Sequence, residues 1–498
     1  MERRKRKIGM VLPLIMTVGM LVAGCSSKSD TPSNTSTSTT KAQTEVTQKD
    51  GELKPVKLVW YLRSAEPKNM PSIMEKANEI IKDKINATVE FKFINPGDYE
   101  QKMQLVMSSG EEYDISFTAS WTNNYFDNVS KGAYAPLDEM LAKYPDLQNM
   151  FKKEVWDAVK VDGKTYGIPN NQIMGDQPGL WMKKDLVDKY NIDVTKVKSL
   201  NDLTPIFQTI KDGEPGVSAI RAGIPTSFME YAPILEGTAG FGYALDTKTW
   251  KVYFQPEQLT SQFKLMREWY EKGFFPQDVA TIKDELSLIK AGKVFSRYSR
   301  QKPGIDAELK TSYGFDVNNS STGPAVISKS AVTSTLNAVS ATSKNPDRAM
   351  MLINLIDTNK ELFNLLKFGI EGQDHTKVSD NRIETKADAY TVPGWLFGNE
   401  LNSFVVPGQP DDVWEQTKKL NDSAVIDPSI SFTFDRKNVE NEIAQLNAIT
   451  AEYKDILTNG LDDVDKTMKS MMDKRKAAGH DKVLAEIQKQ VDEWRKSQ

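Results

Sequence analysis

The sequence predicts an α/β fold with a mostly parallel sheet, followed by a helical C-terminal region. Between residues 56 and 117, apolar runs typical of buried strands alternate with segments whose apolar residues recur at helical spacing. From Asp435 onward, the apolar residues keep the helical period and no strand pattern returns. Strands joined by helix-length connections form right-handed crossovers, so we expect them to lie parallel in a sheet.

The individual elements follow from local patterns. A continuous apolar run such as Val56–Leu62 favours a buried strand, and the alternation in Thr88–Ile94 favours a strand as well. Asn345 followed by Pro346 is typical of a helix start, because Asn can cap and Pro fits the first turn. In chain order, we expect strands at Val56–Leu62, Thr88–Ile94, Tyr113–Phe117, Tyr166–Ile168, Gly179–Met182 and Lys293–Arg297, and helices around Ile73–Ile81, over Tyr99–Ser108, Lys183–Tyr190, Gln258–Lys272 and Ala280–Lys290, and from Pro346.

The first 25 residues have the pattern of a secretory signal. Five basic residues, Arg3 to Lys7, precede an apolar run over Ile8–Ala23 that is short for a bilayer span. Val22-Ala23-Gly24-Cys25 resembles a bacterial lipobox, in which the cysteine becomes the first mature residue and carries lipid. We therefore predict a signal peptide over 1–24 and lipidation at Cys25, on the extracytoplasmic face of the bacterial cell membrane. An ordinary signal peptide and a short membrane anchor are the alternatives.

Composition narrows the function classes. Cys25 is the only cysteine, so the chain cannot form an internal disulfide bond. The whole chain has a formal charge of −4, and because residues 1–24 carry a net charge of +4, the remainder carries −8. This acidic balance argues against nucleic acid as a partner. Residues 25–54 are dominated by Ser, Thr, Gln, Lys and Asp, and we expect a disordered tether there.

Catalytic and metal-binding patterns are scarce. His375 and His480 are the only histidines, and no Gly-x-Ser-x-Gly nucleophile elbow is present. Residues 163–165 end like a P-loop, but position 158 is alanine where that motif needs its first glycine. The acidic group at 462–465 lacks EF-hand spacing. We predict no enzyme, cofactor or metal, while a glycosidase stays open, because carboxylates brought together by folding leave no local pattern.

Six stretches of the chain have the pattern of motifs from known proteins: Val161–Pro169, Leu180–Leu186, Ala291–Val294, Asn337–Ala349, Gly369–Gly372 and Asp427–Trp494. The first four resemble motifs of the extracellular solute-binding lipoproteins (family 1) of bacterial ABC importers. The last two are similar to motifs of the LplA-type subgroup, which has a distinctive C-terminal domain.

This resemblance implies a two-lobed, periplasmic-binding-protein-like fold of type II, with a hinge between the lobes and an added helical region. It also implies that the protein captures an oligosaccharide or related carbohydrate and delivers it to ABC permease subunits in the membrane. We expect a monomer. A lipid-anchored glycoside hydrolase and a peptide-binding or sensory solute-binding protein are the alternatives. The expected domains are a first lobe at 55–169 and 293–330, a second lobe at 170–292 and 331–426, and a C-terminal domain at 427–498.

We expect ligand-binding residues directly after the predicted strands, because open parallel sheets bind ligands beyond the carboxyl ends of their strands. Sugars need flat aromatic faces and fixed hydrogen-bonding groups. The alternatives are a surface salt bridge for Arg63, turn capping for the two amides and core packing for Trp181. The candidates are Arg63, Trp121, Asn170, Gln172, Trp181, Tyr231, Arg297 and Trp395.

Overall fold

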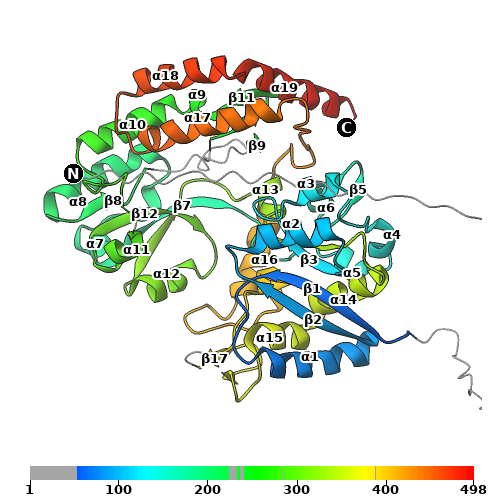
Figure 1. The fold of residues 1–498 in the computed structure, drawn as a ribbon. Coiled ribbons are helices and arrows are strands. Elements are labelled where there is room, and N and C mark those ends of the chain that lie inside the picture. The colour runs from blue at the N-terminus through cyan, green and yellow to red at the C-terminus, as the bar shows by residue number, and fades with distance from the viewer. Residues whose placement is uncertain (1–52, 224–232, 236–240, 283, 387–388, 498) are drawn as a thin grey trace, which may run out of the picture. The chain divides into compact units, whose positions relative to one another are not determined.

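The fold was analysed in a computed structural model, drawn as a ribbon in Figure 1. The structure describes residues 53–497, except 224–232, 236–240, 283 and 387–388. A five-stranded sheet, a four-stranded sheet and a C-terminal group of helices that packs on a three-stranded sheet organise the described residues. The α/β class and the helical C-terminal region predicted from the sequence are thus confirmed.

The first sheet joins strands that lie far apart in the sequence, in the order β2-β1-β3-β15-β6. β1 (Val56–Arg63) pairs in parallel with β2 (Ala87–Ile94) and β3 (Ile115–Thr118), as the strand–helix–strand pattern predicts. β15 (Leu336–Val339) runs antiparallel both to β3 and to β6 (Ile168–Pro169). β6 therefore has the direction of β1 and β3, and the carboxyl ends of these three strands lie at the same edge.

A hydrophobic core surrounds the first sheet. Trp60 of β1 and Phe117 of β3 are fully buried, and α1 places Ile73, Ala77 and Ile81 at helical spacing toward the same core. The two helices after the predicted start at Pro346, α14 and α15, contact α1. The helices packed around this sheet are α1 (Met70–Ile85), α2 (Tyr99–Ser109), α3 (Tyr125–Ser130), α4 (Asp138–Leu141), α5 (Pro145–Gln148), α6 (Lys153–Ala158), α13 (Lys329–Val332), α14 (Pro346–Thr358), α15 (Lys360–Phe368) and α16 (Val413–Ser423).

The second sheet has the order β13-β7-β12-β8. β12 (Val294–Gln301) runs antiparallel to β7 (Gln177–Lys183) and parallel to β8 (Ser218–Ile220), while β13 (Val317–Ser321) pairs with β7. Gly179 of β7 lies tightly between its neighbours, because a Cβ there would come within 2.2 Å of the Ser320 carbonyl oxygen. The helices with this sheet are α7 (Lys184–Lys189), α8 (Leu203–Gly213), α10 (Thr260–Glu271), α11 (Glu285–Lys290) and α12 (Ile305–Tyr313).

The strand pairing corrects the expected lobe boundaries. Residues 293–330 were expected in the first lobe, but β12 and β13 from this segment pair with β7 in the second sheet. Residues 331–426 were expected in the second lobe, but β15 pairs with β3 in the first sheet. The expectation was wrong because an apolar run indicates a strand without indicating which of two sheets will hydrogen-bond to it.

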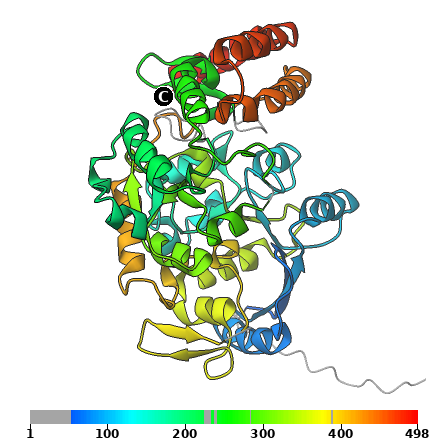
Figure 2. The ribbon, with the colours of Figure 1, turned by 90° about the vertical axis from the view of Figure 1, so that its left-hand side faces the viewer.

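The C-terminal helices pack against strands from the middle of the chain. α17 (Glu440–Thr458), α18 (Val464–Ala477) and α19 (His480–Lys496) contact one another, and Figure 2 shows them side by side. Their apolar residues share a core with Phe254 and Phe263, which the sequence analysis had not assigned to this region. The strands here form a three-stranded sheet of β9 (Pro233–Leu235), β10 (Tyr243–Asp246) and β11 (Lys251–Phe254), beside the short helix α9 (Gln255–Gln258).

Short elements complete the fold. Three two-stranded ladders and four 3₁₀ turns lie among the described residues. The ladders are β4 (Lys160–Val161) with β5 (Lys164–Thr165), β14 (Val326–Ile327) with β18 (Val425–Ile426), and β16 (His375–Lys377) with β17 (Ile383–Thr385); the 3₁₀ turns are Val194–Lys196, Leu200–Asp202, Gly394–Leu396 and Glu400–Asn402.

Candidate functional site

Three candidate residues lie at the carboxyl edge of the first sheet. Arg63 is the last residue of β1, Trp121 follows β3 by three residues, and Asn170 directly follows β6. Because these strands run in the same direction, their ends bring the three residues to one edge, where open α/β sheets bind ligands. The sequence prediction for this edge therefore agrees with the topology.

Two tryptophans and an arginine form an aromatic cluster at this edge. The indole of Trp121 is 52% exposed, and its Nε1 donates a hydrogen bond to the Ser334 carbonyl oxygen at 2.8 Å. The Arg63 guanidinium lies over the Trp121 ring, 4.7 Å from its centroid. Phe117 makes edge contacts with both Trp121 and Trp395, with centroid distances of 6.3 and 5.7 Å. Trp121 is thus a fixed aromatic ring that leaves half of its surface to solvent.

The two candidate amides have positioning roles in this structure. Asn170 is buried; its Nδ2 donates to the Trp395 carbonyl oxygen at 2.7 Å, and its Oδ1 accepts from Asn337 Nδ2 at 2.8 Å. These bonds hold the Trp395 loop beside β15, so Asn170 does not offer its amide to a ligand here. The half-buried Gln172 donates from Nε2 to the Thr335 hydroxyl at 2.8 Å. The sequence could not distinguish such internal partners from a ligand.

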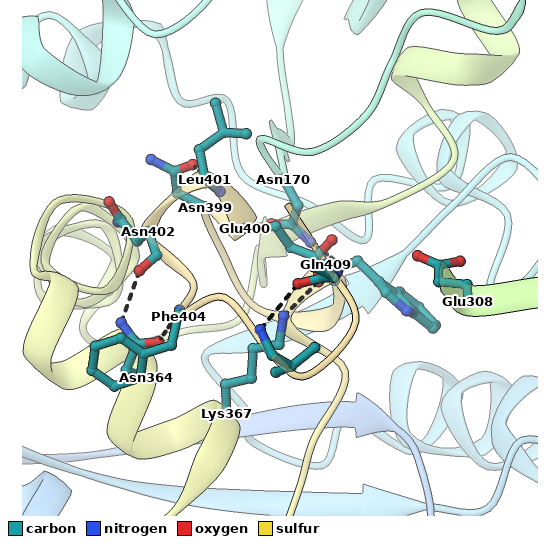
Figure 3. Close-up of polar contacts among 12 residues, drawn as sticks. Asn170, Glu308, Asn364, Lys367, Asn399, Glu400, Leu401, Asn402, Phe404 and Gln409 are labelled. Carbon is teal, nitrogen blue, oxygen red and sulfur yellow. Dashed lines mark hydrogen bonds and ion pairs between the residues drawn. The ribbon is translucent and has the colours of Figure 1, made fainter. Parts of the chain in front are cut away.

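A polar network fixes the loop that follows Trp395 (Figure 3). Lys367 and Glu400 form an ion pair at 3.2 Å, with both side chains largely buried. Asn364 donates to the Asn402 carbonyl oxygen and accepts from the Phe404 amide, each at 2.8 Å. Partly buried charge-assisted bonds of this kind are stronger than exposed ones. The loop is thereby held rigidly against α15.

Two crossings connect the sheets. The chain passes from β6 to β7 through residues 170–176 and returns from β13 to β15 through residues 322–335. Asp176 pairs with Val326 through backbone hydrogen bonds, so the crossings run side by side. Burial raises the pKa of the Asp176 carboxyl, while Arg300 opposes that shift. β6 and β15, which flank these crossings, lie within the first sheet.

Arg297 lies apart from the aromatic cluster. It forms an ion pair through Nε with Glu285, whose other carboxylate oxygen is 3.4 Å from Arg221 Nε. Arg221 directly follows β8, and the sequence analysis missed it. Its position directly after the short strand Ser218–Ile220 is the sequence feature that could have identified Arg221 as a candidate.

The prediction for Trp181 is corrected by its environment. Its side chain is 0% exposed, and its ring contacts Tyr313 and Phe315 at centroid distances of 5.2 and 6.2 Å. The ring has no surface for a ligand and belongs to the core beside the second sheet. The alternative of core packing is the correct one. Tyr231 and Cys25 lie outside the described residues.

In the described part of the chain, no three His, Cys, Asp or Glu side chains gather in an arrangement that could hold a metal ion. None of the helices in the described ranges has the length and apolar content needed to span a bilayer.

Comparison with known proteins decides the family. Residues 65–354 match the profile described as "Bacterial extracellular solute-binding protein", and residues 428–496 match "Domain of unknown function (DUF3502)". The chain belongs to the bacterial extracellular solute-binding protein family. The second match spans the helices α17–α19. The resemblance noted in the sequence, including that of the C-terminal region, is therefore confirmed.

Relatives from Streptococcus pneumoniae cover most of the chain. A "Carbohydrate ABC transporter substrate-binding protein" of serotype 4 is 30% identical over 472 residues, which are 89% of this chain and 92% of the relative. The crystal structure of the N-glycan transport solute binding protein NgtS superposes with a TM-score of 0.78 at 28% identity, covering 88% of this chain and 98% of NgtS. NgtS in complex with Man1GlcNAc gives 0.69 at 27% identity, covering 88% and 99%.

Proposed function

We propose that this protein is the lipid-anchored, carbohydrate-binding component of an ABC importer and that it delivers its ligand to a membrane permease without chemical change. The observation that carries the proposal is the half-exposed Trp121, fixed by Ser334 and Arg63 at the carboxyl edge of the first sheet. It occurs in a chain similar to a carbohydrate ABC transporter protein over nearly its whole length.

The first-sheet edge suits a sugar ring. The CH groups of a pyranose are apolar on one face and pack on the flat surface of an indole, as Trp121 offers. The hydroxyl groups of the sugar need partners when they leave water, because an unpaired buried polar group costs about 1–3 kcal/mol. Arg63 has a buried Nε without a hydrogen-bond partner in the described part of the chain, which supports the proposal that its guanidinium supplies such a donor when a ligand binds.

Ligand binding would bring the two lobes together. Within the described ranges, residues 170–176 and 322–335 connect the two sheets, and residues 427–439 lead from β18 to α17, so small backbone rotations in these three segments would open and close the lobes. A ligand that touches both lobes stabilises the closed form by its greater affinity for that form. The hydrogen bond from Trp121 to Ser334 links the proposed sugar contact directly to one crossing.

Anchoring rests on the N-terminal sequence. The basic start, the apolar run and the lipobox ending at Cys25 predict an acylated protein outside the cytoplasmic membrane. Membership in an extracellular solute-binding family supports that location. Replacement of Cys25 by Ala is expected to release the protein from the cell envelope into the medium, measured by fractionation. Retention of the variant in the membrane fraction would contradict the anchor.

The binding proposal is tested by thermal shift with neutral oligosaccharides, beginning with mannose- and N-acetylglucosamine-containing glycans because NgtS binds Man1GlcNAc. A ligand at one hundred times its Kd stabilises the folded protein by about 2.7 kcal/mol, which raises the melting temperature measurably. Peptides of similar size are the control ligands, which should not raise the melting temperature. Stabilisation by peptides alone would overturn the carbohydrate proposal, and recovery of a cleaved glycan would favour a hydrolase.

A further inference from the structure

Two arginines share one carboxylate beside the second sheet. Arg221 follows β8 directly, Arg297 lies on β12, and the strands are parallel with Ile220 opposite Ser296. Glu285, the first residue of α11, forms an ion pair with Arg297 and lies 3.4 Å from Arg221 Nε. These three side chains together carry a net charge of +1. We call them the Arg221 cluster.

Arg221 differs from the other buried arginines of this chain. Arg348 donates from Nη1 to three backbone carbonyl groups, and Arg475 donates from Nη1 and Nη2 to a carbonyl group and two hydroxyl groups. Arg221 is only 6% exposed, and within the described ranges neither its Nε nor its Nη1 has a hydrogen-bond partner, whereas Arg475 lacks a partner at Nε alone. Glu285 balances the charge of Arg221 at 3.4 Å, but two buried guanidinium donors remain without a hydrogen bond, which is unfavourable.

The cluster is open on one side. The side chain of Arg297 is 41% exposed and that of Glu285 is 33% exposed, whereas that of Arg221 lies beneath them. An incoming anion can therefore reach the Arg297 guanidinium directly, but it reaches the buried donors of Arg221 only when Glu285 moves aside. The planar fork of a guanidinium matches a carboxylate through two parallel hydrogen bonds. The position after β8 is also where ligands meet open α/β sheets.

We propose that the Arg221 cluster binds the carboxylate of an acidic sugar residue, so that the transported ligand is an acidic oligosaccharide. This inference rests on the proposed function and names its substrate class. The aromatic edge of the first sheet holds a sugar ring, and the Arg221 cluster selects for charge. Glu285 occupies the arginines in the absence of ligand and competes with the ligand carboxylate.

The test compares acidic oligosaccharides with their carboxyl-reduced forms, which have the same length and linkage but no charge. Titration calorimetry with the full-length mature protein should give an affinity at least about tenfold higher for the acidic member of a pair, equivalent to about 1.4 kcal/mol. Added salt should weaken only the acidic member. Equal affinity within every pair, or tighter binding of the reduced forms, overturns the inference while the proposed function stands. If no carbohydrate binds at all, the proposed function fails first.

Variants separate a ligand contact from a structural ion pair. Arg221→Met should abolish the preference for the acidic form and leave the affinity for the reduced form. Lys310→Met removes one exposed positive charge from α12 and should leave the preference intact. Glu285→Gln removes the competing carboxylate and should increase the preference, which keeps the test decisive if Arg221→Met does not fold. An unchanged preference in Glu285→Gln, or binding of inorganic phosphate with no preference within the sugar pairs, contradicts the inference.

Discussion

The edges of the two sheets use different chemistry. At the first sheet, Trp121 is exposed, hydrogen-bonded and stacked against Arg63, so that an apolar ring is available while its polar atom is satisfied. At the second sheet, the tryptophan of β7 is buried, and the accessible groups are the charged side chains of Arg297 and Glu285. On our proposals, the first edge supplies contact area for sugars in general and the second supplies discrimination by charge.

The largest expected effect comes from replacing Trp181, the buried tryptophan of the second sheet. Trp181→Ala leaves a cavity among Tyr313 and Phe315 and should lower the free energy of unfolding by about 3–5 kcal/mol. Denaturant or thermal unfolding checks this value, and Trp181→Phe should recover much of it. A stable Trp181→Ala protein that has lost carbohydrate affinity would instead make Trp181 a ligand contact.

The second prediction concerns His480, a buried imidazole that stays neutral, in contrast to the charged side chains at the edge of the second sheet. Burial lowers the pKa of His480 to about 4, and the nearby Arg475 opposes its protonation further. The unfolded chain binds this proton near pH 6.5, so stability falls as pH decreases from about 6.5 to about 4, by at most about 3 kcal/mol. In His480→Gln, the melting temperature should depend less on pH between about 6.5 and about 4. An identical acid response in both proteins would contradict the prediction.

The third prediction concerns the residue that holds the first-sheet edge together. Asn170→Ala leaves the Trp395 carbonyl group and Asn337 Nδ2 without their partner and should cost about 1–3 kcal/mol of stability. It should also weaken carbohydrate binding, because the Trp395 loop is no longer fixed. Thermal melts and ligand titrations measure the two effects. Lost affinity with full stability would indicate that Asn170 contacts the ligand directly.

The smallest expected effect tests whether the exposed ring of Trp121 contacts the ligand. Trp121→Ala should weaken carbohydrate binding by about tenfold, since an aromatic contact contributes about 0.5–1.5 kcal/mol beyond its buried area. Stability should change little, because the indole is half exposed. Trp121→Phe should retain part of the affinity, and Leu105→Ala, at another exposed apolar residue, should retain all of it. Unchanged affinity in Trp121→Ala would remove the aromatic edge from the site.

Much of the first-sheet edge could be predicted from local sequence. Arg63 and Trp121 follow strands whose apolar runs are evident, and chain direction in a parallel sheet then places both at one edge. Asn170 lies at the same edge, but its amide has partners within the chain that local sequence does not reveal, since an amide next to a strand looks the same whether its partner is a ligand or the chain. Arg221 was missed because its cluster forms only when β8 and β12 pair.

The sequence alone determined the alternation of strands and helices, the helical C-terminal region and the N-terminal targeting pattern, because each depends on the spacing of residues close together in the chain. The tertiary structure decided which sheet β12 and β15 join, which tryptophan stays exposed, and which arginines find partners. Those outcomes depend on strand pairing and burial between residues that are distant in the chain, such as Ala338 and Ser116 in the pairing of β15 with β3. Local spacing does not encode such contacts.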